Sequence, residues 1–135
     1  MTPADTPADT PDPGTATDFQ VYPDVVAFVT ECIAPSICRP TGRGRGKWCP
    51  EWWRHPEAVR RLTALWHAWE RLRLEGGAAV STWWLYHFDG HFRELTDPEY
   101  GPFQSCSHEG HTDKLRPLVC EPPPPDWTAE WSKTP

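Results

Sequence analysis

The strongest constraint on the fold is the stretch at residues 56–75, because its apolar side chains recur at helical spacing. Pro56 and Glu57 suit a first turn, where a missing N–H costs little and an acidic side chain is favoured. Gly76-Gly77 is typical of a helix end. A helix of this length spans about 30 Å, enough for the backbone of a small domain. The stripe consists of Val59, Leu62, Leu65, Trp66, Trp69 and Leu72.

Two further segments have helical periodicity. Residues 22–33 space their apolar side chains as a helix does, and Pro35 is expected to stop that helix. Residues 79–95 carry aromatic side chains every three to five positions. Asp89-Gly90 is expected to break this segment into two short helices, with Asp89 capping the second. The short Gly-Gly link before it predicts a long antiparallel hairpin.

The two ends of the chain have a different composition. Residues 1–18 contain four acids, no base and no aromatic side chain, and residues 121–135 include four consecutive prolines. Such segments bury too little apolar surface to offset their chain entropy. The sequence therefore predicts a disordered acidic tail at 1–18, a Trp-rich helical domain at 19–120 and a Pro-rich tail at 121–135.

The predicted fold class is mainly α. We expect a small single-domain helical fold with an irregular Cys/His-containing C-terminal segment and disordered ends. A short strand at residues 115–119 is the one alternative to this helical prediction. No apolar run reaches the length of a membrane span, and the start lacks the features of a secretory signal. We expect a cytoplasmic protein without a membrane partner, whose five cysteines are thiols or metal ligands.

Basic and aromatic side chains are concentrated at residues 39–73. This stretch holds nine of the 13 basic residues and three acids, a local net charge of +6. Aromatic rings beside cations suit unpaired bases and phosphates. The alternative is that the indoles fill the core, which we favour for most of them. The candidate binding residues for nucleic acid or a protein partner are Trp48, Trp52, Trp53, Arg43, Arg45 and Lys47. Of the three tryptophans, Trp48 and one of Trp52 or Trp53 are expected to be exposed.

Cysteine and histidine side chains offer two candidate zinc sites, since thiolates and imidazoles bind zinc tetrahedrally. The chain has no Cys-x-x-Cys pair, and neither set has a standard knuckle spacing. The alternative is a polar loop around a buried Cys106. The local set is Cys106, His108, His111 and Cys120. The non-local set is Cys49, His55, Cys106 and His111.

Catalytic motifs are scarce, which favours a non-enzymatic role. The chain has no Gly-x-Ser-x-Gly, no dinucleotide-binding loop and no His-Glu-x-x-His. Cys49 and His55 are the one conceivable thiol–imidazole pair, and the less favoured alternative is a cysteine-dependent enzyme. In the tail, Trp127 and Trp131 are expected either to fold back on the domain or to bind a partner.

Several motifs occur in an order that resembles a known family. They are residues 48–58 (WCPEWWRHPEA), residues 65–70 (LWHAWE), residues 81–84 (STWW), then His87, Asp89 and His91, and finally residues 101–103 (GPF) with Cys106 and His111. Over about residues 21–120 the chain resembles a short actinobacterial family catalogued only as a domain of unknown function.

The resemblance implies an accessory role in mobile genetic elements, such as plasmids, phages and integrative conjugative elements. It implies no reaction. Nucleic acid or a protein of the transfer apparatus would be the partner. The family has a proline where this chain has Gly90. Cys49, Cys106 and His111 match recurring positions of the family, which favours the non-local zinc set.

Overall fold

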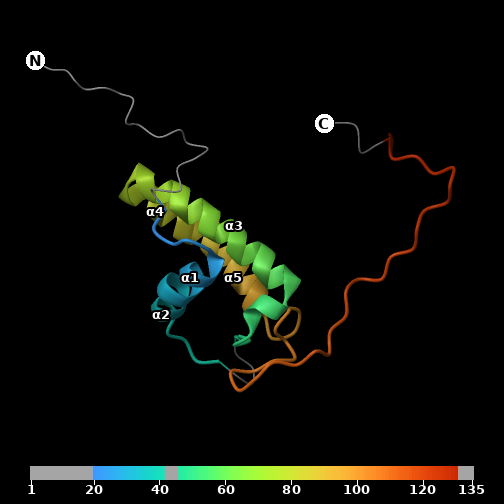
Figure 1. The fold of residues 1–135 in the computed structure, drawn as a ribbon, viewed down its shortest axis with the longest axis horizontal. Coiled ribbons are helices and arrows are strands. Elements are labelled where there is room, and N and C mark those ends of the chain that lie inside the picture. The colour runs from blue at the N-terminus through green and yellow to red at the C-terminus, as the bar shows by residue number, and fades with distance from the viewer. Residues whose placement is uncertain (1–19, 42–45, 131–135) are drawn as a thin grey trace, which may run out of the picture.

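The computed structural model describes residues 20–41 and 46–130, and that part of the chain is helical (Figure 1). It forms three helical segments, and no strand occurs among the described residues. The prediction of a small, mainly helical single domain is confirmed. The alternative strand at residues 115–119 is wrong, because that stretch is extended and pairs with no neighbour. The acidic tail at 1–18, Arg43, Arg45 and Trp131 lie outside the described residues.

The central helix is where the apolar stripe predicted it. Helix α3 spans Pro56–Leu72, and one further 3₁₀ turn, Arg73–Glu75, extends it. Gly76 then ends the segment with φ of 102°. L residues with a side chain rarely adopt this backbone conformation, so glycine is required at the turn.

The third segment is one continuous helix. It comprises α4 (Gly77–Thr82), a π-helical turn (Trp83–Phe88) and α5 (Asp89–Thr96). The predicted break at Asp89-Gly90 is therefore wrong. The rings of Phe88 and Phe92 stack with centroids 4.8 Å apart on the core side of this helix. A break between them would cost that burial, which outweighs the weak helix propensity of one glycine.

The first segment also continues past its predicted end. It consists of α1 (Val25–Phe28), a π-helical turn (Val29–Ile33) and α2 (Ala34–Ser36). Asp24 caps it by accepting a hydrogen bond of 2.8 Å from the Ala27 N–H. Pro35 lies inside the last turn and does not stop the helix. The widened π turn directly before it already has a non-standard hydrogen-bond pattern, so the missing proline N–H is tolerated.

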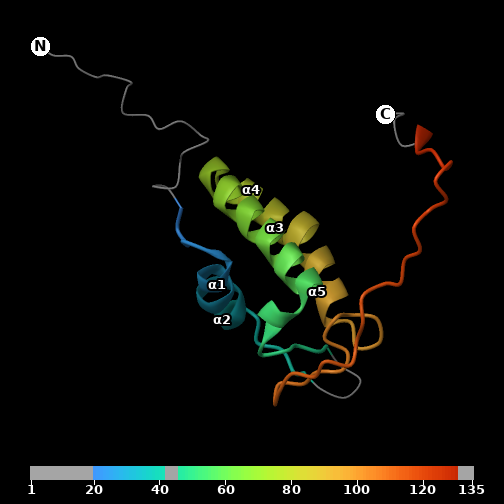
Figure 2. The ribbon, with the colours of Figure 1, turned by 45° about the vertical axis from the view of Figure 1, so that its right-hand side comes forward.

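The core lies between the hairpin of α3 with α4–α5 and the first helical segment, which packs across one side of the hairpin (Figures 1 and 2). The Trp83 side chain is fully buried and donates a hydrogen bond of 2.9 Å to the Leu65 carbonyl. Phe28 meets the Trp83 ring edge-on at 6.1 Å. The indoles of Trp66, Trp69 and Trp84 pack around this core and are partly buried, as expected for the hairpin tryptophans.

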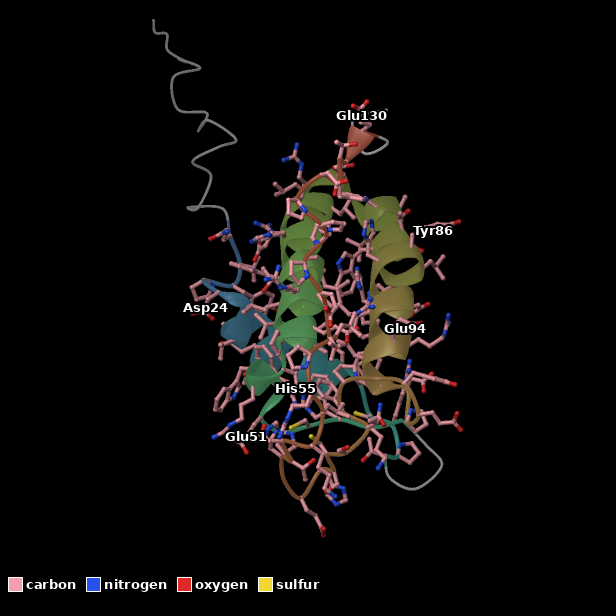
Figure 3. The ribbon with its side chains drawn as sticks, turned by 90° about the vertical axis from the view of Figure 1, so that its right-hand side faces the viewer. Asp24, Glu51, His55, Tyr86, Glu94 and Glu130 are labelled. Atoms are coloured by element: carbon pink, nitrogen blue, oxygen red, sulfur yellow. The ribbon has the colours of Figure 1, made fainter. Side chains whose placement is uncertain are left out.

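After α5 the chain has no further α-helix in the described residues. Residues 97–112 form turns against the open end of the hairpin, and the chain then extends away from the body to Glu130 (Figures 1 and 3). Among the helices described, none combines the length and apolarity that a bilayer crossing demands.

Candidate metal centre

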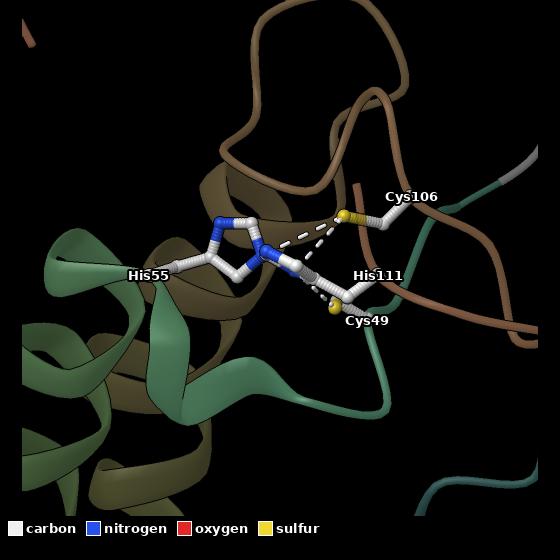
Figure 4. Close-up of side chains that lie close together, drawn as sticks. All are labelled: Cys49, His55, Cys106 and His111. Atoms are coloured by element: carbon white, nitrogen blue, oxygen red, sulfur yellow. Dashed lines mark hydrogen bonds between the residues drawn. The ribbon is translucent and has the colours of Figure 1, made fainter. Parts of the chain in front are cut away.

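Four cysteine and histidine side chains converge at the open end of the hairpin. Cys49, His55, Cys106 and His111 each offer one ligand atom, and these four atoms all lie within 4.8 Å of one another (Figure 4). The set unites two chain segments about fifty residues apart. It is the non-local set that the sequence offered, and both cysteines are buried.

The first pair is held by the turn that leads into α3. Between Cys49 and His55 lies a 3₁₀ turn, Trp52–Arg54, closed by a hydrogen bond of 3.0 Å from the His55 N–H to the Trp52 carbonyl. His55 is the N-cap residue, and Pro56 begins the helix. The buried Trp52 ring anchors the turn in the core.

The second pair is held by the irregular segment after α5. The Cys106 N–H donates to the Phe103 carbonyl at 2.9 Å, and Ser107 and Gly110 exchange two backbone hydrogen bonds that close a tight turn before His111. The fully buried Phe103 ring packs edge-on against His55 with centroids 5.0 Å apart. This packing joins the second segment to the first.

Four of the six distances between ligand atoms are close to those around a tetrahedral metal. Nδ1 of His111 lies 3.1 Å from Nε2 of His55, 3.3 Å from Sγ of Cys49 and 3.7 Å from Sγ of Cys106. Sγ of Cys106 is 3.5 Å from Nε2 of His55. Four ligands around one zinc ion at ordinary bond lengths would be separated by about 3.3 to 3.8 Å. One imidazole nitrogen cannot satisfy three such neighbours by hydrogen bonds, whereas a central cation satisfies all of them.

Two neighbours support these ligands from outside. Nε2 of His111 donates a hydrogen bond of 2.6 Å to Oδ1 of Asp113, which leaves Nδ1 as the unprotonated, ligating nitrogen. The Thr112 N–H donates to Sγ of Cys106 at 3.4 Å, as backbone amides do to metal-bound thiolates. Sequence reasoning missed both residues. The signal that could have identified Asp113 is its His-x-Asp spacing from His111.

Electrostatics favour the metal-binding form of His55 but not that of Cys49. Burial lowers the pKa of His55, and the neighbouring His111 lowers it further, so the neutral form that binds metals is favoured. Burial, with Cys106 close by, raises the pKa of the Cys49 thiol to about 11. A bound cation acts in the opposite direction, because it stabilises the thiolate. The hydrogen bond from His111 lowers the pKa of Asp113.

The local zinc set is wrong. His108 and Cys120 are both exposed, and neither belongs to the cluster of close ligand atoms. The tight turn at Ser107–Gly110 directs Cys106 and His111 inward and leaves His108 outside. Cys120 follows on the extended segment that leaves the domain.

The fold buries some of the candidate binding residues and exposes others. Trp52 is buried in the core, whereas Trp53 is 54% exposed and carries the Arg54 guanidinium 5.6 Å from its ring centroid. Trp48 is half-buried against Phe103. Lys47 is tied to the end of α5 by its N–H, which donates to the Thr96 carbonyl at 2.8 Å. Arg43 and Arg45 fall outside the described residues.

The fold and the site define a small helical domain with a Cys₂His₂ cluster at one end. The model of one family, described as "Domain of unknown function (DUF4913)", matches residues 22–124, and the chain belongs to that family. No curated protein and no solved structure matches the chain.

Proposed function

We propose that this protein is a zinc-stabilised, non-enzymatic interaction domain. The observation that carries the proposal is the convergence of two thiols and two imidazoles from distant segments at tetrahedral spacing. Tetrahedral S₂N₂ sites select zinc among the common metals. Closed four-ligand sites of this kind are structural, since catalytic zinc keeps one position open for water or substrate.

Burial argues against the cysteine-dependent enzyme. Cys49 is fully buried, so a substrate has no route to its sulfur. The nearest imidazole nitrogens also belong to the same ligand cluster. A nucleophile would need an accessible thiolate. We therefore assign Cys49 and His55 to the metal.

The experiment is elemental analysis of the full chain, purified from cytoplasmic expression without chelators. We expect about one zinc per chain. Cys106→Ser and His111→Ala should each lose it, whereas Cys120→Ser should retain it because Cys120 is an exposed cysteine outside the cluster. Zinc well below one per chain in the wild type, or equal zinc in Cys106→Ser and Cys120→Ser, would contradict the proposal.

A spectroscopic measurement on the wild type covers the case in which the ligand variants fail to fold. Cobalt(II) in place of zinc gives visible absorption bands characteristic of tetrahedral coordination, together with thiolate charge-transfer bands. We expect both. Octahedral cobalt bands would exclude this site.

The biological setting is an extension of the proposal. We place the protein in the cytoplasm as an accessory domain of a mobile genetic element, supported by the resemblance of its motif order and by a chain rich in unpaired cysteines. Gene neighbourhoods of family members test this: they should contain transfer, replication or phage genes more often than random loci do.

Nucleic acid is the alternative partner to a protein. The exposed Trp53 beside Arg54 is the observation that favours it, because such pairs stack on unpaired bases. Binding of single-stranded and double-stranded DNA across a salt series tests it. Trp53→Ala should weaken single-strand binding, and absence of binding at low salt would leave the protein partner.

A further inference from the structure

A pocket of about 490 Å³ lies beside the metal centre, between the first helical segment and α5. Ile33 and Ile37 line one side, and Trp48 and Phe92 line the other. Two of its lining residues lie close in the sequence to the candidate metal ligands. Trp48 precedes Cys49, and His108 lies in the turn between Cys106 and His111.

The lining defines the class of ligand. The rings of Trp48 and Phe92 stack at 6.1 Å with an interplanar angle of 28°, so one wall is aromatic. The Arg39 guanidinium lies 5.8 Å from the Phe92 ring centroid and supplies a positive charge to the pocket. Apolar pockets with few polar groups take apolar ligands whose orientation the polar groups fix. This pocket suits an aromatic group with an adjacent carboxylate.

The C-terminal arm, defined as residues 114–130, carries such a group. It is extended and contains apolar side chains that the described part of the chain leaves exposed: Leu118 is 93%, Val119 is 92% and Trp127 is 49% exposed. Trp127 lies at the end of a turn, in which its backbone N–H donates to the Pro124 carbonyl at 3.0 Å. Asp126 lies directly before it.

Charge favours the same pairing. Residues 117–130 contain Glu121, Asp126 and Glu130 and no basic side chain, whereas Arg39 supplies a positive charge to the lining of the pocket. Opposite potentials steer association and fix register. The arm also points away from its own domain (Figures 1 and 2). From Asp113 to Trp127 an extended chain reaches about 46 Å, far enough to contact another molecule.

We propose that the pocket is a docking site for an acid-flanked tryptophan and that its occupant is the arm of a second copy of this chain. Trp127 enters against Trp48 and Phe92, and Asp126 faces Arg39. The inference rests on the proposed function in one respect, because the metal holds the loops that carry Trp48 and His108. Zinc content is therefore measured on every sample, which separates a lost metal from a wrong docking site.

The first test uses a labelled peptide with the sequence of residues 121–130 and zinc-loaded full-length Trp127→Ala protein, whose own arm no longer competes. We expect saturable binding by fluorescence anisotropy. Replacing the tryptophan of the peptide by alanine should weaken binding about tenfold or more, as for a buried aromatic anchor. Replacing its aspartate by lysine should weaken binding mainly at low salt. No binding to protein with full zinc would overturn the docking site.

The second test measures the mass of the full chain in solution at increasing concentration. We expect the wild type to self-associate, Trp127→Ala and Arg39→Glu to remain monomeric, and a mixture of these two variants to form a heterodimer through the one intact arm and the one intact pocket. Tyr86→Ala is the control for loss of an exposed aromatic side chain and should associate as the wild type does. A wild type that is monomeric at all concentrations, with the peptide still binding, would overturn the second copy as occupant and indicate docking within one chain.

Discussion

Glu70 shows how one buried carboxylate organises the fold. It is the one charged side chain in the buried class among the described residues, and it accepts hydrogen bonds from the backbone N–H groups of Val21 and Tyr22 at 2.8 to 3.1 Å. Trp66 donates to the same carboxylate from within α3, and Arg73 donates to it from the 3₁₀ turn that extends α3. Glu70 therefore fixes the start of the described chain to the middle of the domain.

Glu70→Gln should destabilise the protein by about 1 to 3 kcal/mol, because the amide loses the charge and turns a donor toward other donors. Urea unfolding followed by tryptophan fluorescence measures this. Glu75→Gln, at an exposed acid five positions along the chain, should have little effect and serves as the control. Equal stabilities of the two variants would show that the Glu70 interactions contribute nothing.

The same carboxylate predicts a pH dependence. Burial alone would raise the pKa of Glu70, but the N–H groups of Tyr22 and Val21, with Arg73 and Trp66, lower it. A lowered folded-state pKa contributes stability above the ordinary glutamate value of about 4.3, and this is lost as the pH falls through the folded-state pKa. The stability difference between wild type and Glu70→Gln should therefore shrink below about pH 4. Acid release of zinc affects both proteins and cancels in the difference.

Asp113 acts on the metal through His111. Asp113→Asn should weaken zinc binding by about ten- to a hundredfold, since the orienting carboxylate is lost while all four ligands remain. Competition with a chromophoric chelator measures the affinity. Glu109→Gln removes an exposed acid from the same loop and should leave the affinity unchanged. An unchanged affinity in Asp113→Asn would show that His111 needs no support from outside.

At the scale of elements, two π turns let helices continue where the sequence suggested an end. One precedes Pro35 and the other precedes Gly90. Each lies where a helix must keep buried aromatic or aliphatic side chains on the core side despite a poor helix former nearby. The hairpin turn itself depends on one backbone conformation, at Gly76.

Gly76→Ala should destabilise the domain by about 1 kcal/mol or more, because alanine is strained at a φ of 102° although nothing lies within 4 Å of its added methyl group. Gly77→Ala is the matched control. It lies in the first turn of α4 with equally open surroundings, so it should be neutral or slightly stabilising. In thermal unfolding, Gly76→Ala should have the lower melting temperature of the two variants. A lower melting temperature for Gly77→Ala would show that the backbone strain does not lie at Gly76.

At the scale of the whole molecule, the four candidate ligands border the helical core at one end. Cys49 and Cys106 belong to the buried cluster that continues through Trp52 and Phe103 to the side chains between the helices. The ligands gather where the turn before α3 meets the segment after α5 (Figures 3 and 4). In the proposed role, a zinc ion would hold the two loops together at this end, while apolar burial holds the helices together.

Removal of zinc by a chelator should therefore lower the melting temperature by at least about 10 °C, if the ion is present far above its dissociation constant and contributes about 4 kcal/mol. Far-UV circular dichroism should retain most of its helical signal. Mass spectrometry after alkylation should show Cys49 and Cys106 modified only once zinc is removed, whereas the exposed Cys38 and Cys120 react in both states. Complete unfolding on chelation would show that the helices depend on the metal.

The sequence by itself determined the helices that carry a local signal. The stripe at residues 56–75 and the Gly-Gly link define the hairpin, because periodicity and turn chemistry depend on near neighbours. Local rules failed at Gly90, where burial of side chains from a continuous helix outweighed the propensity of one residue. They also failed at Pro35, where the preceding π turn lets the helix continue to Ser36.

The sequence also offered the four candidate ligands that the fold brings together, but next to a local set that was equally open on spacing alone. Only the tertiary structure decided between them, since nothing local brings Cys49 and His55 to Cys106 and His111. The packing of Phe103 on His55 does so. The tight turn at Ser107–Gly110 leaves His108 outside, and Cys120 follows on the extended segment. A metal site built from two distant turns is a property of how the chain packs, and the geometry of four atoms exists only after that packing is complete.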